Sequence, residues 1–84
     1  MQKNILLILQ KNRTQSSIKV QEILSHYGCF IKTRLGLHDT NQQECHPGGF
    51  IFLDMAEDKK AIKDCLNQLN QLEGVKAQWV EMGF

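Results

Sequence analysis

The most constraining feature of the chain is the run NILLILQ over residues 4–10, which is apolar at five consecutive positions. A short run of this kind, rich in branched residues, is typical of a β-strand with both faces buried. A second run, FIFLDM over Phe50–Met55, also carries apolar side chains at odd and even positions. Because the sequence has only 84 residues, both strands must belong to one core. They are predicted to be the central strands of one sheet.

Two segments have the periodicity of amphipathic helices. In the first, Val20, Ile23, Leu24 and Tyr27 fall on one helical face, Thr14 or Ser16 is a suitable N-cap, and Gly28 a suitable end. The second segment precedes Gly74, and its apolar residues recur at helical spacing. They are Ala61, Ile62, Cys65, Leu66, Leu69 and Leu72.

Two further strands complete the set. Residues 29–39 alternate, with Cys29, Ile31, Thr33, Leu35 and Leu37 on one side and Phe30, Lys32, Arg34, Gly36 and His38 on the other. Residues 40–49 are polar and contain the only proline, which indicates a hairpin loop before the strand at 50–55. Residues 75–82 alternate again and form the last strand.

The resulting order is βαββαβ, which predicts an α+β, ferredoxin-like fold over residues 1–84 as a single domain. Right-handed crossovers place the first and third strands in the centre of a four-stranded antiparallel sheet. Both helices then lie on one face of that sheet. The opposite face is left without a covering element.

This uncovered face predicts self-association. We expect Leu6, Ile8, Phe50 and Phe52 to form the oligomer interface, because such contiguous apolar residues are costly to leave in water. A second copy of the same sheet is the simplest cover, giving a homodimer or tetramer. The alternative is a monomer with a few exposed apolar residues.

Composition argues against several classes of protein. The chain is 42% hydrophobic and 23% charged, as in compact folded proteins, and its net charge of +1 lacks the basic excess of a nucleic-acid-binding module. No segment supplies the ~20 apolar residues of a membrane span, so a cytoplasmic protein without membrane contact is expected. The three cysteines, Cys29, Cys45 and Cys65, are widely spaced and are expected to be free thiols.

Three segments resemble a known family. They are KTRLGLH at 32–38, FIFL at 50–53 and LNQLEGVK at 69–76. They are similar to the small ACT-like proteins called iron-only hydrogenase system regulators. The resemblance implies an ACT-like fold, a dimer or larger oligomer, and a regulatory role in hydrogenase systems of anaerobic bacteria. The turn at residues 11–13 lacks the glycine common in amino-acid-binding ACT domains, so that mode of binding is not expected.

The hairpin offers two candidate sites. His38, Cys45 and His46 could converge on a transition metal such as zinc, nickel, copper or iron, but a polar hairpin with solvated loop histidines is the preferred interpretation. Lys32, Arg34 and His38 could meet an anionic ligand, or form a solvated strand face. No other cofactor is expected.

No nucleophile with a base and no pair of carboxylates stands out, so the sequence predicts no catalysis. The leading hypothesis is an ACT-like regulatory module that oligomerises through its sheet and binds a small effector or a partner protein. The chain has no room for a helix-turn-helix, so any role as a transcriptional regulator would pass through a partner. The alternatives are a metal sensor or carrier using the hairpin site, and a purely structural assembly subunit.

Overall fold

The computed structural model describes the backbone of residues 1–40 and 45–84 and the side chains of residues 1–37 and 48–84. Its elements, in chain order, are β1 (Gln2–Gln10), α1 (Arg13–His26), the 3₁₀ turn η1 (Gly28–Phe30), β2 (Ile31–Thr40), β3 (Cys45–Met55), α2 (Lys59–Asn70) and β4 (Val75–Gly83).

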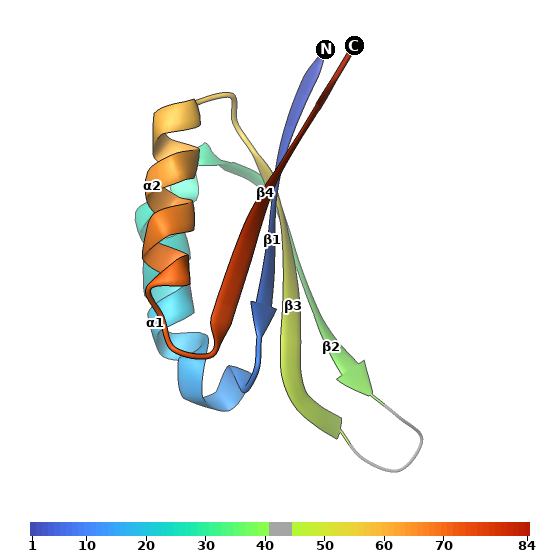
Figure 1. Ribbon diagram of the computed structural model, residues 1–84, viewed down its shortest axis with the longest axis vertical. Helices are drawn as coiled ribbons and strands as arrows, with labels where there is room; N and C mark the ends of the chain where they lie inside the picture. The colour runs from blue at the N-terminus through green and yellow to red at the C-terminus, as the bar shows by residue number, and fades with distance from the viewer. Residues whose placement is uncertain (41–44) are drawn as a thin grey trace.

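The four strands form one sheet in the order β2-β3-β1-β4, and every neighbouring pair is antiparallel. Both helices lie on the same side of this sheet, and the other side is open (Figure 1). The predicted βαββαβ order and ferredoxin-like class are confirmed, with β1 and β3 in the centre. The strand ends at the β2–β3 hairpin extend beyond the helices, so the sheet is longer than its cover (Figure 1).

The helix ends differ in part from the predicted ones. The N-cap of α1 is Asn12, whose Oδ1 accepts hydrogen bonds from the backbone N–H groups of Thr14 and Gln15 at 3.0 and 3.4 Å. Asp58 caps α2 by accepting from the N–H of Ala61 at 3.1 Å. An asparagine or aspartate in this position satisfies backbone donors that the helix itself leaves unpaired. No helix in the described part of the chain is long and apolar enough to cross a membrane.

The core lies between the helices and the sheet. Asn4 and Gln10 are buried there as well, and both are hydrogen-bonded: Trp79 Nε1 donates to Asn4 Oδ1 at 3.2 Å, and Gln10 Nε2 donates to Ser16 Oγ at 2.9 Å. A buried amide is tolerated when it has such a partner. The buried apolar residues are Leu6, Ile8, Val20, Leu24, Tyr27, Ile51, Leu53, Met55, Ala61, Ile62, Cys65, Leu69 and Val75.

The hairpin strands also depart from the predicted pattern. A register shift between Ile31 and Thr33 leaves Lys32 as an extra residue, so Ile31 pairs with Met55 and packs toward the core. Such a bulge reverses the alternation of the strand. The returning strand begins at Cys45 and not at residue 50, because its backbone already pairs there with β2.

Candidate functional site

The uncovered side of the sheet carries a contiguous apolar surface on β1, β2 and β3. It consists of Ile5, Leu7, Leu9, Leu35, Leu37, Phe50 and Phe52, and we call this set the open face. The register explains the grouping, because residues paired across antiparallel strands point to the same face. Leu7 pairs with Phe52, and Phe52 pairs on its other side with Leu35. The next row is formed by Leu9, Phe50 and Leu37.

The four predicted interface residues lie on two different sides of the sheet. Phe50 and Phe52 lie on the open face, but Leu6 and Ile8 have no exposed surface and belong to the core under the helices. Their assignment to the interface is wrong, since Leu6 pairs with Leu53 and Ile8 with Ile51 on the helix side. Their neighbours on β1 take their place on the open face.

The open face is substantially exposed in the single chain. Leu9, Leu35 and Leu37 expose 54%, 51% and 53% of their surface, and the two phenylalanines are half-buried. Burying an aliphatic or aromatic side chain of this size completely is worth ~1.5–3 kcal/mol, so half-burial leaves about 1 kcal/mol per residue unused. A contiguous apolar surface of this kind is a candidate interaction site.

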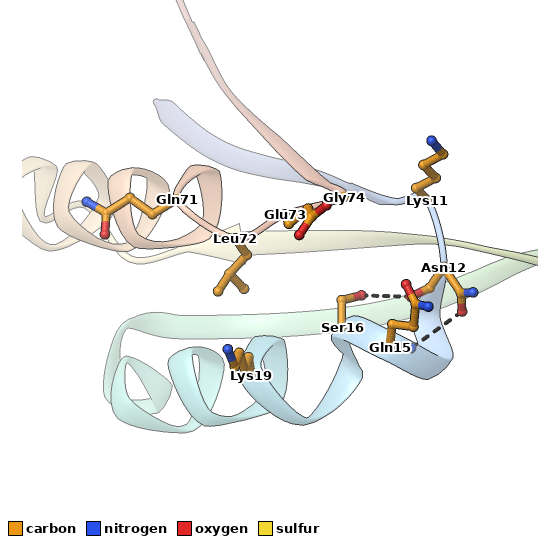
Figure 2. A pocket seen from close by; sticks show the side chains of 9 residues that line it. All are labelled: Lys11, Asn12, Gln15, Ser16, Lys19, Gln71, Leu72, Glu73 and Gly74. Atoms are coloured by element: carbon orange, nitrogen blue, oxygen red, sulfur yellow. Dashed lines mark hydrogen bonds between the residues drawn. The ribbon is translucent and has the colours of Figure 1, made fainter.

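A polar groove lies on the helix side, where the turn from β1 into α1 meets the connection from α2 to β4. It has a volume of about 810 Å³ and is lined by Lys11, Asn12, Gln15, Ser16, Lys19, Gln71, Leu72, Glu73 and Gly74. In Figure 2 the residues from α1 form one wall, and Leu72 points toward them from the other.

Several backbone and side-chain hydrogen bonds hold the walls of this polar groove. The N–H of Lys11 donates to the Gly74 carbonyl oxygen at 2.7 Å and joins the end of β1 to the start of β4. Gly74 has a φ of 73°, a conformation that disfavours side chains. Ser16 Oγ donates to the Asn12 carbonyl oxygen at 3.1 Å (Figure 2). The bond between Lys11 and Gly74 fixes the two walls of the groove relative to each other.

The chemistry of the polar groove suits a small polar ligand. Lys11 and Lys19 provide ammonium groups, Glu73 a carboxylate, and Asn12, Gln15 and Gln71 amides. Lys11 and Gly74 also line a second, mainly apolar hollow at the end of the sheet, whose lining includes Leu9, Leu37, Phe50, Val75 and Lys76. The groove and the open face therefore share a wall. Sequence reasoning missed the groove because its two walls lie about sixty residues apart and Gly74 indicated only a helix end.

The candidate residues of the hairpin lie elsewhere. Lys32 and Arg34 are exposed on β2, at the opposite edge of the sheet from β4, and neither lines the polar groove. The side chains of His38, Cys45 and His46 lie outside the described residues, so both hairpin sites stay predictions. Where side chains are described, no three His, Cys, Asp or Glu residues are grouped to hold a metal ion.

The described cysteines are both free thiols, as predicted, but they differ chemically. Cys29 is exposed, whereas Cys65 is fully buried on α2, and burial raises the pKa of its thiol to about 11. Burial also raises the pKa of Tyr27, with further contributions from the negative charge of Asp64 and from that of Cys65 once its thiol ionises. Both groups are therefore held in their neutral forms by the fold.

This burial predicts a loss of stability at alkaline pH. Since the pKa of Cys65 is raised from 9.0 to about 11 on folding, its stabilising contribution is complete below pH 9.0 and is lost as the pH rises toward 11. Two pH units correspond to about 3 kcal/mol. Urea unfolding between pH 8 and 11 should show this decline, and Cys65→Ala should show a shallower one, with Tyr27 present in both proteins. Equal slopes would contradict the assignment.

Comparison with known proteins shows the fold. No family model and no curated protein matches the sequence. Among solved structures, the uncharacterized protein TM1266 from Thermotoga maritima is 24% identical, with a TM-score of 0.82 over 99% of this chain and 100% of that one. CPII, a nitrogen regulatory PII-like protein from Thiomonas intermedia K12 bound to ADP, AMP and bicarbonate, is 10% identical, with a TM-score of 0.63 over 100% and 96%.

A third similar structure is the ACT domain from GTP pyrophosphokinase of Chlorobium tepidum. It is 11% identical, with a TM-score of 0.67 over 95% of this chain and 97% of that domain. The chain thus has the fold shared by ACT and PII-like proteins, which confirms the ACT-like architecture. At these identities the similarity extends to the fold alone.

Proposed function

We propose that the protein is a non-catalytic regulatory module that assembles through its open face and binds a small polar effector in the polar groove. The observation that carries this proposal is the continuous apolar open face, which leaves Leu7, Phe50 and Phe52 partly in water in a single chain. A homodimer or tetramer covers that surface with the same surface of another copy.

The position of the groove supports a regulatory link. Lys11 and Gly74 border the polar groove on one side and the hollow of the open face on the other. A ligand that contacts this wall differently in free and assembled chains shifts the equilibrium between them. Effector binding then changes the amount of assembled protein, and the assembled form is the one that a partner protein binds.

The similar structures agree with this proposal. One of them is a nitrogen regulatory PII-like protein bound to ADP, AMP and bicarbonate, and another is an ACT domain of GTP pyrophosphokinase. The resemblance of residues 32–38, 50–53 and 69–76 to iron-only hydrogenase system regulators supports a role in a hydrogenase system. In that setting the module is cytoplasmic and acts on hydrogenase expression through a partner, without contacting nucleic acid itself.

Two measurements on the full chain test the proposal. Light scattering at micromolar concentration should report a dimer or tetramer. Thermal unfolding with ADP, AMP, bicarbonate or free amino acids should identify a probe that raises the Tm, because a ligand at a hundred times its Kd stabilises the native state by ~2.7 kcal/mol. A monomer that none of these probes stabilises would overturn the proposal.

A matched pair of variants locates the effector site. Lys19→Glu reverses a charge on the α1 wall of the polar groove and should abolish the rise in Tm. Lys63→Glu makes the same change at an exposed position of α2 that does not line the groove, and should retain the rise. Loss of the response in both variants, or in neither, would place the effector elsewhere.

A further inference from the structure

The two ends of the open face differ in chemistry. Near the start of β1, Lys3 Nζ lies 3.4 Å from Asp54 Oδ2, and the two residues stand on the two central strands. Both point to the open side, because each alternates with core residues of its strand. At the other end of the face, β1, β2 and β3 carry Leu9, Leu37 and Phe50, and Lys76 of the edge strand β4 pairs with Leu9. On its two central strands, β1 and β3, the face thus has a charged end and an apolar end.

The carboxylate at the charged end lacks part of its hydrogen bonding. Asp54 Oδ1 is buried and has no hydrogen-bond partner among the described residues, while Oδ2 is held by Lys3 alone. A buried carboxylate oxygen without a donor is costly. The terminal torsion of an aspartate is soft, so a small rotation can turn this oxygen toward a donor that arrives from above the sheet. The open face therefore has a place for a cation from its partner.

Two symmetric packings of the open face on itself keep the strands of the two sheets aligned. With the two-fold axis running across the strands, the charged end of one copy lies on the apolar end of the other. That packing buries Lys3 and Asp54 against leucine and phenylalanine side chains, which is unfavourable. With the axis running along the strands between β1 and β3, like ends meet, and β1 of each copy lies over β3 of the other.

We infer that two copies pack with the axis along the strands, so that Lys3 of each copy pairs with Asp54 of the partner subunit. This inference rests on the proposed assembly through the open face and adds its orientation. The charges are self-complementary in this arrangement because the positive group stands on β1 and the negative group on β3. Aligned sheets pack about 10 Å apart, a gap that a lysine side chain can bridge. The four charged groups form one network at the rim of an apolar interface.

A charge-swapped chain tests this orientation. The double variant Lys3→Glu, Asp54→Lys retains opposite charges within each chain and between two copies of itself. A mixed dimer with the wild type instead brings two carboxylates together at one contact and two ammonium groups together at the other. The swapped chain and isotope-labelled wild type are unfolded together in urea, refolded as an equal mixture, and counted by native mass spectrometry. We expect mixed dimers to fall from the statistical share of about half to about a tenth or less.

A second mixture tests the same orientation without the swapped chain, in case that chain folds poorly. The single variants Lys3→Glu and Asp54→Lys are each repulsive in their own dimers, but complementary to each other across the interface. Their mixture should contain mixed dimers in excess of half. Mixed dimers at the statistical share in both experiments would overturn the orientation. Monomers from every chain, wild type included, would instead overturn the assembly on which the inference rests.

Discussion

The variant Phe52→Asp is expected to dissociate the assembly into monomers that remain folded. Phe52 lies in the middle of the open face, between Leu7 on β1 and Leu35 on β2. The substitution removes an aromatic side chain from each copy and brings two carboxylates into an interface without donors for them. We expect the dissociation constant to rise at least 100-fold, which corresponds to about 2.7 kcal/mol.

Light scattering and circular dichroism together measure this outcome, because the mass should fall while the secondary structure stays. The matched control is Ile18→Asp, which removes an apolar side chain that is 74% exposed on α1, on the opposite side of the molecule. That variant should assemble like the wild type. If Ile18→Asp dissociates the protein and Phe52→Asp does not, the interface lies on the helix side, and the role of the open face is refuted.

The fold could be predicted because its elements have strong local patterns. The two apolar runs at residues 4–10 and 50–55, and the helical stripe that ends before Gly74, define the element order, and short connections leave little choice of topology. The predicted start of the first helix was less accurate, because several neighbouring side chains can act as its N-cap. Asn12, Thr14 and Ser16 can all cap a helix, and only the structure shows that the Asn12 side chain reaches the first free N–H groups.

The placement of the interface residues could not be read from alternation alone. Leu6 and Leu7 are identical neighbours, and a strand that is apolar on both sides does not show which side the helices cover. Asn4 and Gln10 lie on the same side of β1 as Leu6. In the sequence, two amides on one side of a strand suggest that this side faces solvent, and only the structure shows that they are buried against Trp79 and Ser16. The correct choice depends on contacts between distant residues.

The polar groove could not be predicted from the sequence for a related reason. Its walls come from residues 11–19 and 71–74, which meet only because β1 and β4 are neighbours in the sheet. Neither segment carries a binding motif by itself. The hairpin, by contrast, contains histidine and cysteine, whose chemistry can be recognised from the sequence alone. The predicted sites were therefore placed in the hairpin. Residue type shows what a side chain can bind, whereas topology decides which side chains share a site.

The adjacent leucines of β1 should separate the stability of the chain from its assembly. We expect Leu6→Ala to lower the free energy of unfolding by about 3 kcal/mol, because Leu6 is fully buried beside Leu53 and its loss leaves a cavity. Leu7→Ala should cost the isolated chain less than about 1 kcal/mol, since Leu7 lies on the open face. Urea unfolding of both variants in the Phe52→Asp background measures these values without a contribution from assembly.

A milder change covers the case in which Leu6→Ala does not fold. Leu6→Val removes a single methylene and should cost about 1 kcal/mol, still more than Leu7→Val at the neighbouring position. In chains that retain Phe52, the dissociation constant of the oligomer should show the opposite order. Leu7 variants should raise it, and Leu6 variants should leave it nearly unchanged. Equal unfolding costs at the two positions would mean that the open face already belongs to the core of the single chain. The apolar surface would then need no second copy to cover it.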